Sequence, residues 1–243
     1  MSEIIFIALI GLCVGSFLNV VILRIPKGEN IAFPASHCPT CKHSLRWYHN
    51  IPLLSWVFLR GKCAFCHTSI SIQYPLIEFG STLLFILAFL QSDTLLQAAI
   101  SATLFSLLLA LSIIDLRYKA VPDSLSIPAF FIALFMDDFL ISLQAALLLA
   151  GAFAMLRIII SWVIKKEAMG EADIIIAGVI GGALGVQLGL CAIYIAALIA
   201  LPIFVYVAKK GYELPFIPFL SLGLLISWLA KIRILEFIGT WYA

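Results

Sequence analysis

From Ile174 to Ala208 the chain runs without a single charged residue. About 20 apolar helical residues cross the hydrocarbon core of a bilayer, so this run is too long for one crossing. It fits two, with a turn near residues 187–189. Hydrophobic residues make up 63% of the chain and charged residues 12%, well below the roughly 25% charge of soluble domains. The sequence therefore predicts a polytopic membrane protein.

Apolar runs elsewhere in the chain predict an all-α fold with about eight transmembrane helices. The six besides the pair just described are expected at residues 4–23, 75–90, 94–114, 124–136, 139–164 and 215–230. The only sizeable polar segment, residues 26–74, holds all four histidines and four of the six cysteines. We expect three parts: a first transmembrane helix (1–25), a cysteine-rich loop (26–74) and a transmembrane domain (75–243).

The positions of the basic residues predict the orientation of these helices. Cations gather at the cytoplasmic ends of membrane spans. If the N-terminus is outside, 12 of the 15 basic residues fall on the cytoplasmic side. Arg157 lies within snorkelling distance of that side, and only Lys231 and Arg233 fall on the other side. The residues on the cytoplasmic side are Arg24, Lys27, Lys42, Arg46, Arg60, Lys62, Arg117, Lys119, Lys165, Lys166, Lys209 and Lys210.

Two Cys-x-x-C pairs in the cysteine-rich loop predict a metal site. They are Cys38-Pro39-Thr40-Cys41 and Cys63-Ala64-Phe65-Cys66, and four thiolates complete the closed tetrahedron of structural zinc. Two disulfides or a redox pair would also use this spacing. Stable disulfides are rare in the reducing cytosol, where the predicted topology places the loop. We therefore expect a small zinc-ribbon-like loop with Cys38, Cys41, Cys63 and Cys66 as ligands.

Two aspartates at the cytoplasmic ends of apolar runs predict a catalytic site. Asp115 follows one run, and Asp173 precedes Ile174 at the start of another. A charged group at that depth is costly unless it is used. Two close carboxylates cannot both ionise cheaply, so one stays protonated while the other can deprotonate water. This predicts an aspartyl protease at the membrane face. Glu171 and Glu78 are rival acids.

Glycines recur every fourth residue within the long uncharged run: Gly181, Gly185 and Gly189 in one series, and Gly178 and Gly182 in another. This spacing is typical of transmembrane helices that pack closely together. No strand precedes the glycines, so a dinucleotide-binding loop is not expected. They are interpreted as packing positions.

Several separate motifs over nearly the whole chain resemble those of the bacterial prepilin peptidases, or type IV leader peptidases. The motifs are Gly15-Ser16-Phe17-Leu18-Asn19-Val20, Ser36-His37-Cys38-Pro39-Thr40-Cys41, Asn50-Ile51-Pro52-Leu53-Leu54-Ser55-Trp56, Arg60-Gly61-Lys62-Cys63-Ala64-Phe65-Cys66, Ile72-Gln73-Tyr74-Pro75-Leu76-Ile77-Glu78, Ile114-Asp115-Leu116-Arg117 and Leu214-Pro215-Phe216-Ile217-Pro218-Phe219-Leu220. One motif departs from the family. The usual Gly-x-Gly-Asp is Gly170-Glu171-Ala172-Asp173 here, and the change removes a residue free to take unusual backbone angles. Since alanine is the smallest alternative, we expect the loop to survive.

The resemblance implies an enzyme of the bacterial inner membrane with its active site facing the cytoplasm. Asp115 and Asp173 would activate water to cut the leader from type IV prepilins or pseudopilins. Members with the cysteine loop then N-methylate the new terminal residue with S-adenosylmethionine. The implied partners are these substrates and membrane lipid, with no nucleic acid.

Two other classes of function remain open from the sequence. A non-enzymatic scaffold of a pilus or secretion machine would use only the zinc loop and would leave both aspartates replaceable. A transporter would use the two acids as a proton relay. Transporter acids belong near the bilayer midplane, however, and these two lie at helix ends.

Overall fold

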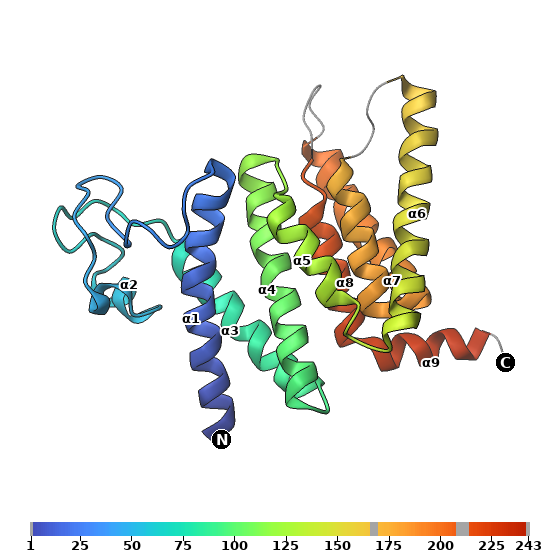
Figure 1. Cartoon of the computed structure of the whole chain (residues 1–243), viewed down its shortest axis with the longest axis horizontal. Helices are drawn as coiled ribbons and strands as arrows, with labels where there is room; N and C mark the ends of the chain where they lie inside the picture. The colour runs from blue at the N-terminus through green and yellow to red at the C-terminus, as the bar shows by residue number, and fades with distance from the viewer. Residues whose placement is uncertain (1, 166–169, 208–213, 242–243) are drawn as a thin grey trace. The chain divides into compact units, whose positions relative to one another are not determined.

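The computed structural model describes the chain except for residues 1, 166–169, 208–213 and 242–243. Four residues used in the predicted topology lie outside the described residues: Lys166, Ala208, Lys209 and Lys210. The described part is helical and contains no strand, only two isolated β-bridges in the cysteine-rich loop. The main helices are α1 (Ser2–Arg24), α2 (Leu54–Phe58), α3 (Gln73–Gln91), α4 (Leu95–Tyr118), α5 (Asp123–Ala133), α6 (Phe139–Ile164), α7 (Glu171–Val207), α8 (Ile217–Leu229) and α9 (Lys231–Trp241), as Figure 1 shows.

The helical class predicted from the sequence is confirmed, but the count of eight spans is not. Among the described residues, five helices are long and apolar enough to cross a membrane: α1 together with the short 3-10 turn after it, α3, α4, α6 and α7. The bent pair of α8 and α9 raises the number to six if it forms one span. Helix α5 has only 11 residues, about 16 Å of helix. It is therefore shorter than the hydrocarbon core of a bilayer, which is about 30 Å thick.

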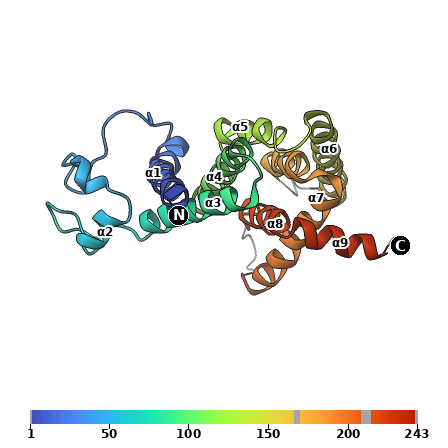
Figure 2. The same cartoon turned by 90° about the horizontal axis from the view of Figure 1, so that it is seen from below.

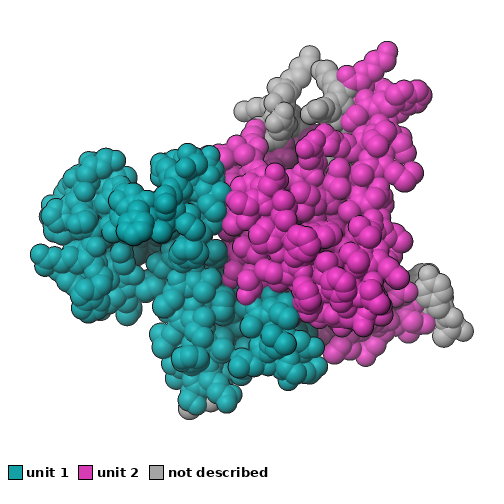
Figure 3. Space-filling model, viewed as in Figure 1, with its two compact units in different colours: residues 1–102 teal, residues 103–243 magenta. Residues whose placement is uncertain are grey.

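The chain divides into two compact units, residues 1–102 and residues 103–243, coloured separately in Figure 3. In the first unit, α1 packs along α3 through small residues. A Cβ atom added to Gly11 would lie 2.8 Å from Cα of Thr82, and one added to Gly15 would lie 2.6 Å from Cα of Glu78. Neither distance is open to a real side chain, so glycine is required where the two backbones meet. Small residues thus form the face of α1 that packs on α3.

In the second unit, α7 consists of two helical segments that meet at a break at Gly185, where φ is +73° and ψ is 179°. Only glycine adopts this conformation readily. A Cβ added to Gly189 would lie 3.5 Å from Cγ2 of Ile180, although nine residues of straight helix would separate the two by about 13 Å. The chain therefore turns back at Gly185. The predicted turn exists, two residues before the expected 187–189.

The other glycines of this run are packing positions, as predicted. An added Cβ would meet Phe130 at Gly178, the backbone of Ala145 at Gly181, Leu134 at Gly182 and Leu149 at Gly189. Gly185 is the exception, because nothing lies within 4 Å of its Cβ position. Helices α5, α6 and α8 all pack against α7, which lies between α5 and α8 in the view from below (Figure 2). Helix α7 is thus the centre of the second unit.

The ends of two helices differ from the sequence prediction. Helix α4 continues for three residues past Asp115 and ends at Tyr118, before Lys119 adopts a positive φ of 50°. Helix α9 was not predicted. It turns 77° away from α8 (Figure 1) and carries Lys231 and Arg233. Its charged residues interrupt the apolar pattern that indicates a span, so hydrophobic length alone did not reveal it.

Candidate functional site

The four predicted metal ligands meet in the first unit. The thiol sulfurs of Cys38, Cys41, Cys63 and Cys66 all lie within 4.8 Å of one another. Cys38 and Cys63 are buried, whereas Cys41 is exposed. All four members of the group are cysteines. Four thiols converging at this range can hold one tetrahedral metal ion.

Two matching backbone turns produce this convergence. In the first, Cys38 N–H donates to His43 O at 3.0 Å and Lys42 N–H donates to Cys38 O at 2.9 Å. In the second, Cys63 N–H donates to Thr68 O at 2.9 Å and His67 N–H donates to Cys63 O at 3.0 Å. Lys42 and His67 occupy the same place in each turn and have φ of +58° and +57°. The segment thus folds as two equivalent turns, or knuckles, one for each Cys-x-x-Cys pair.

The knuckles also set the acidity of the thiols. Hydrogen bonds from the side chain and backbone of Thr68 lower the pKa of Cys66 to about 6. The backbone N–H of Cys41 lowers the pKa of Cys38 against the opposing effect of burial. The backbone N–H of His43 has the same effect on Cys41, but burial and hydrogen bonds with the other thiols outweigh it and raise the pKa of Cys41 to about 11. The pKa is thus lowered for Cys38 and Cys66 and raised for Cys41, and a divalent cation bound to the cluster would favour the thiolate form of its ligands.

The two predicted catalytic aspartates both belong to the second unit. Asp115 lies in the last turn of α4 and is 7% exposed. Its Oδ2 accepts a hydrogen bond of 3.2 Å from the backbone N–H of Ile217, the first residue of α8. The first N–H groups of a helix have no partner within that helix and carry a partial positive charge. The N-terminus of α8 therefore both orients and stabilises the Asp115 carboxylate.

Asp173 is held in a similar way at the N-terminus of α7. It is the third residue of that helix, and its Oδ2 accepts a hydrogen bond of 3.2 Å from Gly170 N–H. This is the returning half of a capping box. The two carboxylates that the sequence paired thus both lie in the second unit, and each accepts a backbone N–H at the start of a helix.

The departure at position 172 has a simple structural explanation. Ala172 lies in the first turn of α7, and it is not among the residues with positive φ. No left-handed conformation is needed there, so alanine fits the backbone that the family usually builds with glycine. The expectation that this segment survives the change is met in the backbone.

The rival acids are not part of this pair. Glu171 points to the surface, where it is 82% exposed and forms an ion pair of 3.2 Å with Arg157 of α6. Glu78 lies in the first unit, buried beside α1. Residues 214–220 were identified from the sequence as a family motif without a physical role. The structure shows that Ile217, between Pro215 and Pro218, supplies the N–H group that holds Asp115. Two prolines framing a helix start were the available signal.

Both parts of the chain match models of known protein families. A model described as the bacterial peptidase A24 N-terminal domain matches residues 9–92, and the type IV leader peptidase family model matches residues 102–205. The prepilin leader peptidase/N-methyltransferase of Myxococcus xanthus is 39% identical over 73% of this chain, and the match spans 55% of that protein's length. No solved structure matches.

Two further relatives match over most of their length. The type 4 prepilin-like proteins leader peptide-processing enzyme of Escherichia coli is 37% identical over 88% of both chains. The prepilin leader peptidase/N-methyltransferase of Neisseria gonorrhoeae is 31% identical over 96% of this chain and 93% of its own. Together with the two family matches, these similarities show that the chain belongs to the type IV leader peptidase family.

Proposed function

We propose that this chain is a membrane aspartic endopeptidase that cuts the leader from type IV prepilins or pseudopilins, with Asp115 and Asp173 as its catalytic pair. Membership of the leader peptidase family supplies the reaction. The observation that carries the residue assignment is that two carboxylates of the second unit, from separate helices, each accept a backbone N–H at a helix N-terminus. A scaffold would not require two acids that are held in the same way.

The arrangement suits hydrolysis of a peptide bond by general acid–base catalysis. Two carboxylates that interact at close range share one proton. The ionised group takes a proton from water as the water oxygen attacks the scissile carbonyl, and the protonated group donates its proton to the carbonyl oxygen. A proton then passes to the leaving nitrogen as the C–N bond breaks. The N–H groups of Ile217 and Gly170 each occupy one carboxylate oxygen, so that the other is available to water.

We further propose a location for the reaction: the cytoplasmic face of the bacterial inner membrane. The distribution of basic residues supports this orientation. Counting α5, α8 and the two halves of α7 as separate crossings would give the eight expected spans. Residues 1–25, 26–74 and 75–243 would then be the first span, a cytoplasmic loop and the peptidase domain. An apolar prepilin helix could approach through the lipid while its basic leader stays in the cytosol.

The cysteine-rich loop would hold structural zinc through Cys38, Cys41, Cys63 and Cys66. The closed set of four thiols, with no open position for a substrate, supports a structural ion. The relatives named as N-methyltransferases support a second activity, in which the new N-terminal amine is methylated with S-adenosylmethionine as donor.

The test is mass spectrometry of a co-expressed prepilin with the wild-type chain and with Asp115→Asn and Asp173→Asn separately. Asparagine still accepts the N–H of Ile217 or Gly170, so each helix keeps its cap and only the acid is lost. We expect each variant to lower cleavage by about a hundred- to ten-thousand-fold. Asp123→Asn, at an exposed acid in the first turn of α5, is the matched control and retains cleavage.

The alternatives give different outcomes in the same experiment. A scaffold would leave the leader in place with the wild-type chain and a cognate prepilin. Cleavage that persists in both asparagine variants would reject the pair. An added methyl group on the mature product would establish the second activity.

A further inference from the structure

Helix α9 turns away from the other helices of the second unit at an angle that the peptidase mechanism does not explain. One residue separates it from α8, and it turns by 77° from that helix. Figure 1 shows α9 running across the direction of α6 and α7 rather than along it. An ion pair of 3.4 Å between Lys231 Nζ and Asp137 Oδ2 ties the first residue of α9 to the turn before α6. The bend therefore lies at the level where α6, a candidate membrane span, begins.

The lengths of α8 and α9 are too small for one bent membrane span. Helix α8 has 13 residues and is about 20 Å long. Helix α9 has 11 residues, and at 77° it adds only about 4 Å along the direction of α8. The pair therefore reaches about 24 Å, short of the roughly 30 Å of the hydrocarbon core. Three of the 11 residues of α9 are charged as well, and charges within the core are costly.

The sequence of α9 places apolar and polar side chains on opposite faces of the helix. At 3.6 residues per turn, Ile234, Leu235 and Ile238 share one face. Arg233 and Glu236 lie on the face opposite to them. Two faces of different polarity are typical of helices that lie in the interface of a membrane, with the apolar face towards the acyl chains.

Large apolar side chains of α9 are left uncovered by the rest of the second unit. Ile232 is 68% exposed, Leu235 is 39% exposed and Phe237 is 63% exposed. Exposed apolar groups gathered on one short element mark a surface that contacts a membrane or another protein. Since the chain is a multi-pass membrane protein, hydrocarbon is available to cover them.

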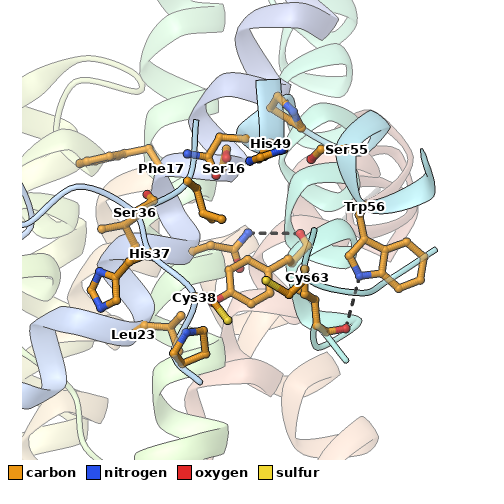
Figure 4. A pocket seen from close by; sticks show the side chains of 18 of the residues that line it. Ser16, Phe17, Leu23, Ser36, His37, Cys38, His49, Ser55, Trp56 and Cys63 are labelled. Atoms are coloured by element: carbon orange, nitrogen blue, oxygen red, sulfur yellow. Dashed lines mark hydrogen bonds between the residues drawn. The ribbon is translucent and has the colours of Figure 1, made fainter. Parts of the chain in front are cut away.

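An apolar hollow lies between α9 and α7 and differs in character from the cavity of the first unit. The cavity of the first unit has a volume of about 640 Å³, and polar side chains such as Asn19, His49 and Glu78 line it (Figure 4). The hollow in the second unit has a volume of about 360 Å³, and its lining is Leu190, Cys191, Tyr194, Ile195 and Ile234. No charged group is part of this lining. The hollow therefore suits a hydrocarbon chain rather than a polar ligand.

We propose that α9 is an in-plane helix that binds the phospholipid surface at which α6 begins. Its apolar face lies among acyl chains, which also fill the hollow beside Ile234, and its polar face lies at the level of the headgroups. Arg233 suits this place, because neither of the two ion pairs found among the described residues involves it and lipid phosphates are negative. The proposal also explains why Lys231 and Arg233 depart from the distribution of the other basic residues. They belong to a helix that does not cross the membrane.

This placement has a consequence for the candidate active site. Helix α8 connects α9 to Ile217, whose N–H group holds Asp115. With 13 residues, α8 keeps that N–H group within about 20 Å of the surface that α9 binds. Helix α9 therefore acts as an anchor that limits the depth of Asp115. The placement of α9 itself does not depend on the proposed peptidase activity, whereas this consequence does.

The test is fluorine NMR of the full-length chain in phospholipid nanodiscs, with trifluoromethylphenylalanine in place of one residue at a time. Leu235 reports on the apolar face of α9, and Thr240, an exposed residue four positions after Glu236, reports on the polar face. Phe33 of the cysteine-rich loop, which is 76% exposed, is the aqueous control. Three paramagnetic agents are compared: a nitroxide near the headgroup end of the acyl chain, a nitroxide at the acyl-chain terminus and a water-soluble gadolinium chelate.

We expect the nitroxide near the headgroup to relax the Leu235 probe several-fold more than either other agent does. Gadolinium should relax the Thr240 probe several-fold more than the Leu235 probe, and it should relax the Phe33 probe most. The melting temperature of each labelled protein shows whether it is folded. A probe at Phe237, which keeps the native ring and adds only the fluorinated group, repeats the measurement with the least disturbance and should also be relaxed by the nitroxide near the headgroup.

Three results would overturn the proposal. Strongest relaxation of both α9 faces by the terminal nitroxide would make α8 and α9 one bent span. Strongest relaxation of both faces by gadolinium would place α9 in water. Protection of both faces from all three agents would mean that another protein or a second copy of the chain covers α9. Leader cleavage is not part of this measurement, so a failure of the proposed peptidase is distinguishable from a failure of the anchor.

Discussion

The two units build their sites in different ways. In the first, the four thiols come from two short knuckles, each closed by its own backbone hydrogen bonds. In the second, the carboxylate of Asp115 is held by an N–H group 102 residues further along the chain, and the second candidate acid, Asp173, comes from another helix. One site is a local structure repeated twice. The other exists only when separate helices are packed.

This difference predicts what disrupts each site. Each knuckle depends only on its own turn and its own cysteines. The substitutions that disrupt the metal site are therefore those of the cysteines themselves. The aspartate pair depends on where α4, α7 and α8 lie, so it is sensitive to substitutions far from either carboxylate. Substitutions at four positions test this difference between the two sites.

The largest effect is expected from loss of one thiol. Cys63→Ser removes a ligand that is buried in the cluster, and three thiols leave a tetrahedral site open. Bound zinc should fall from about one ion per chain to almost none at micromolar metal, because apparent binding energies of about 10–16 kcal/mol depend on the full ligand set. Elemental analysis of purified protein measures this. Cys191→Ser, in the second unit, should keep its zinc; equal retention by Cys63→Ser would mean that three thiols suffice.

The next effect concerns helix packing in the second unit. Gly181→Ala forces a methyl group against the backbone of Ala145, and overpacking of this kind costs about 1–3 kcal/mol. We expect a lower melting temperature in detergent and weaker leader cleavage, because α7 carries Asp173. Gly151→Ala in α6 meets nothing within 4 Å and is the matched control. If both variants melt like the wild type, the close α6–α7 contact is not what holds the unit.

A smaller effect separates the two roles of Asp173. Both Asp173→Asn and Asp173→Ala should lower cleavage by about a hundred- to ten-thousand-fold, but only alanine removes the acceptor for Gly170 N–H. The alanine variant should therefore lose about 1 kcal/mol of stability relative to the asparagine variant. Thermal unfolding of both proteins measures the difference. Equal melting temperatures would show that the cap contributes nothing.

The smallest effect is expected at position 172. Ala172→Gly restores the glycine usual in the family at a residue that is already helical. Glycine in a helix costs up to about 1 kcal/mol relative to alanine, so stability should fall slightly and cleavage should stay near the wild-type level. A large gain in cleavage, measured by the rate of leader release, would show that the alanine constrains the site.

Local features of the fold could be predicted from the sequence, whereas features that depend on helix packing could not. The bounds of α6 were predicted to the residue, because Asp138 caps its start through hydrogen bonds from Leu140 N–H and Ile141 N–H and basic residues follow its end. The cysteine knuckles were predictable because ligands three residues apart need only a local turn. The span count was not confirmed, since α5 is short and α7 folds back at a single glycine. Helix α9 was missed because it is not apolar throughout.

The sequence by itself predicted the membrane class, the cluster of four cysteines and the two candidate acids, because each is encoded by neighbouring residues or by hydrophobic length. Only the tertiary structure decided that Ile217 holds Asp115, that the chain turns back at Gly185, and that Glu78 and Asn19 face one cavity. These contacts join residues far apart in the chain. Side-chain spacing along a sequence carries no information about such distances until the helices have packed.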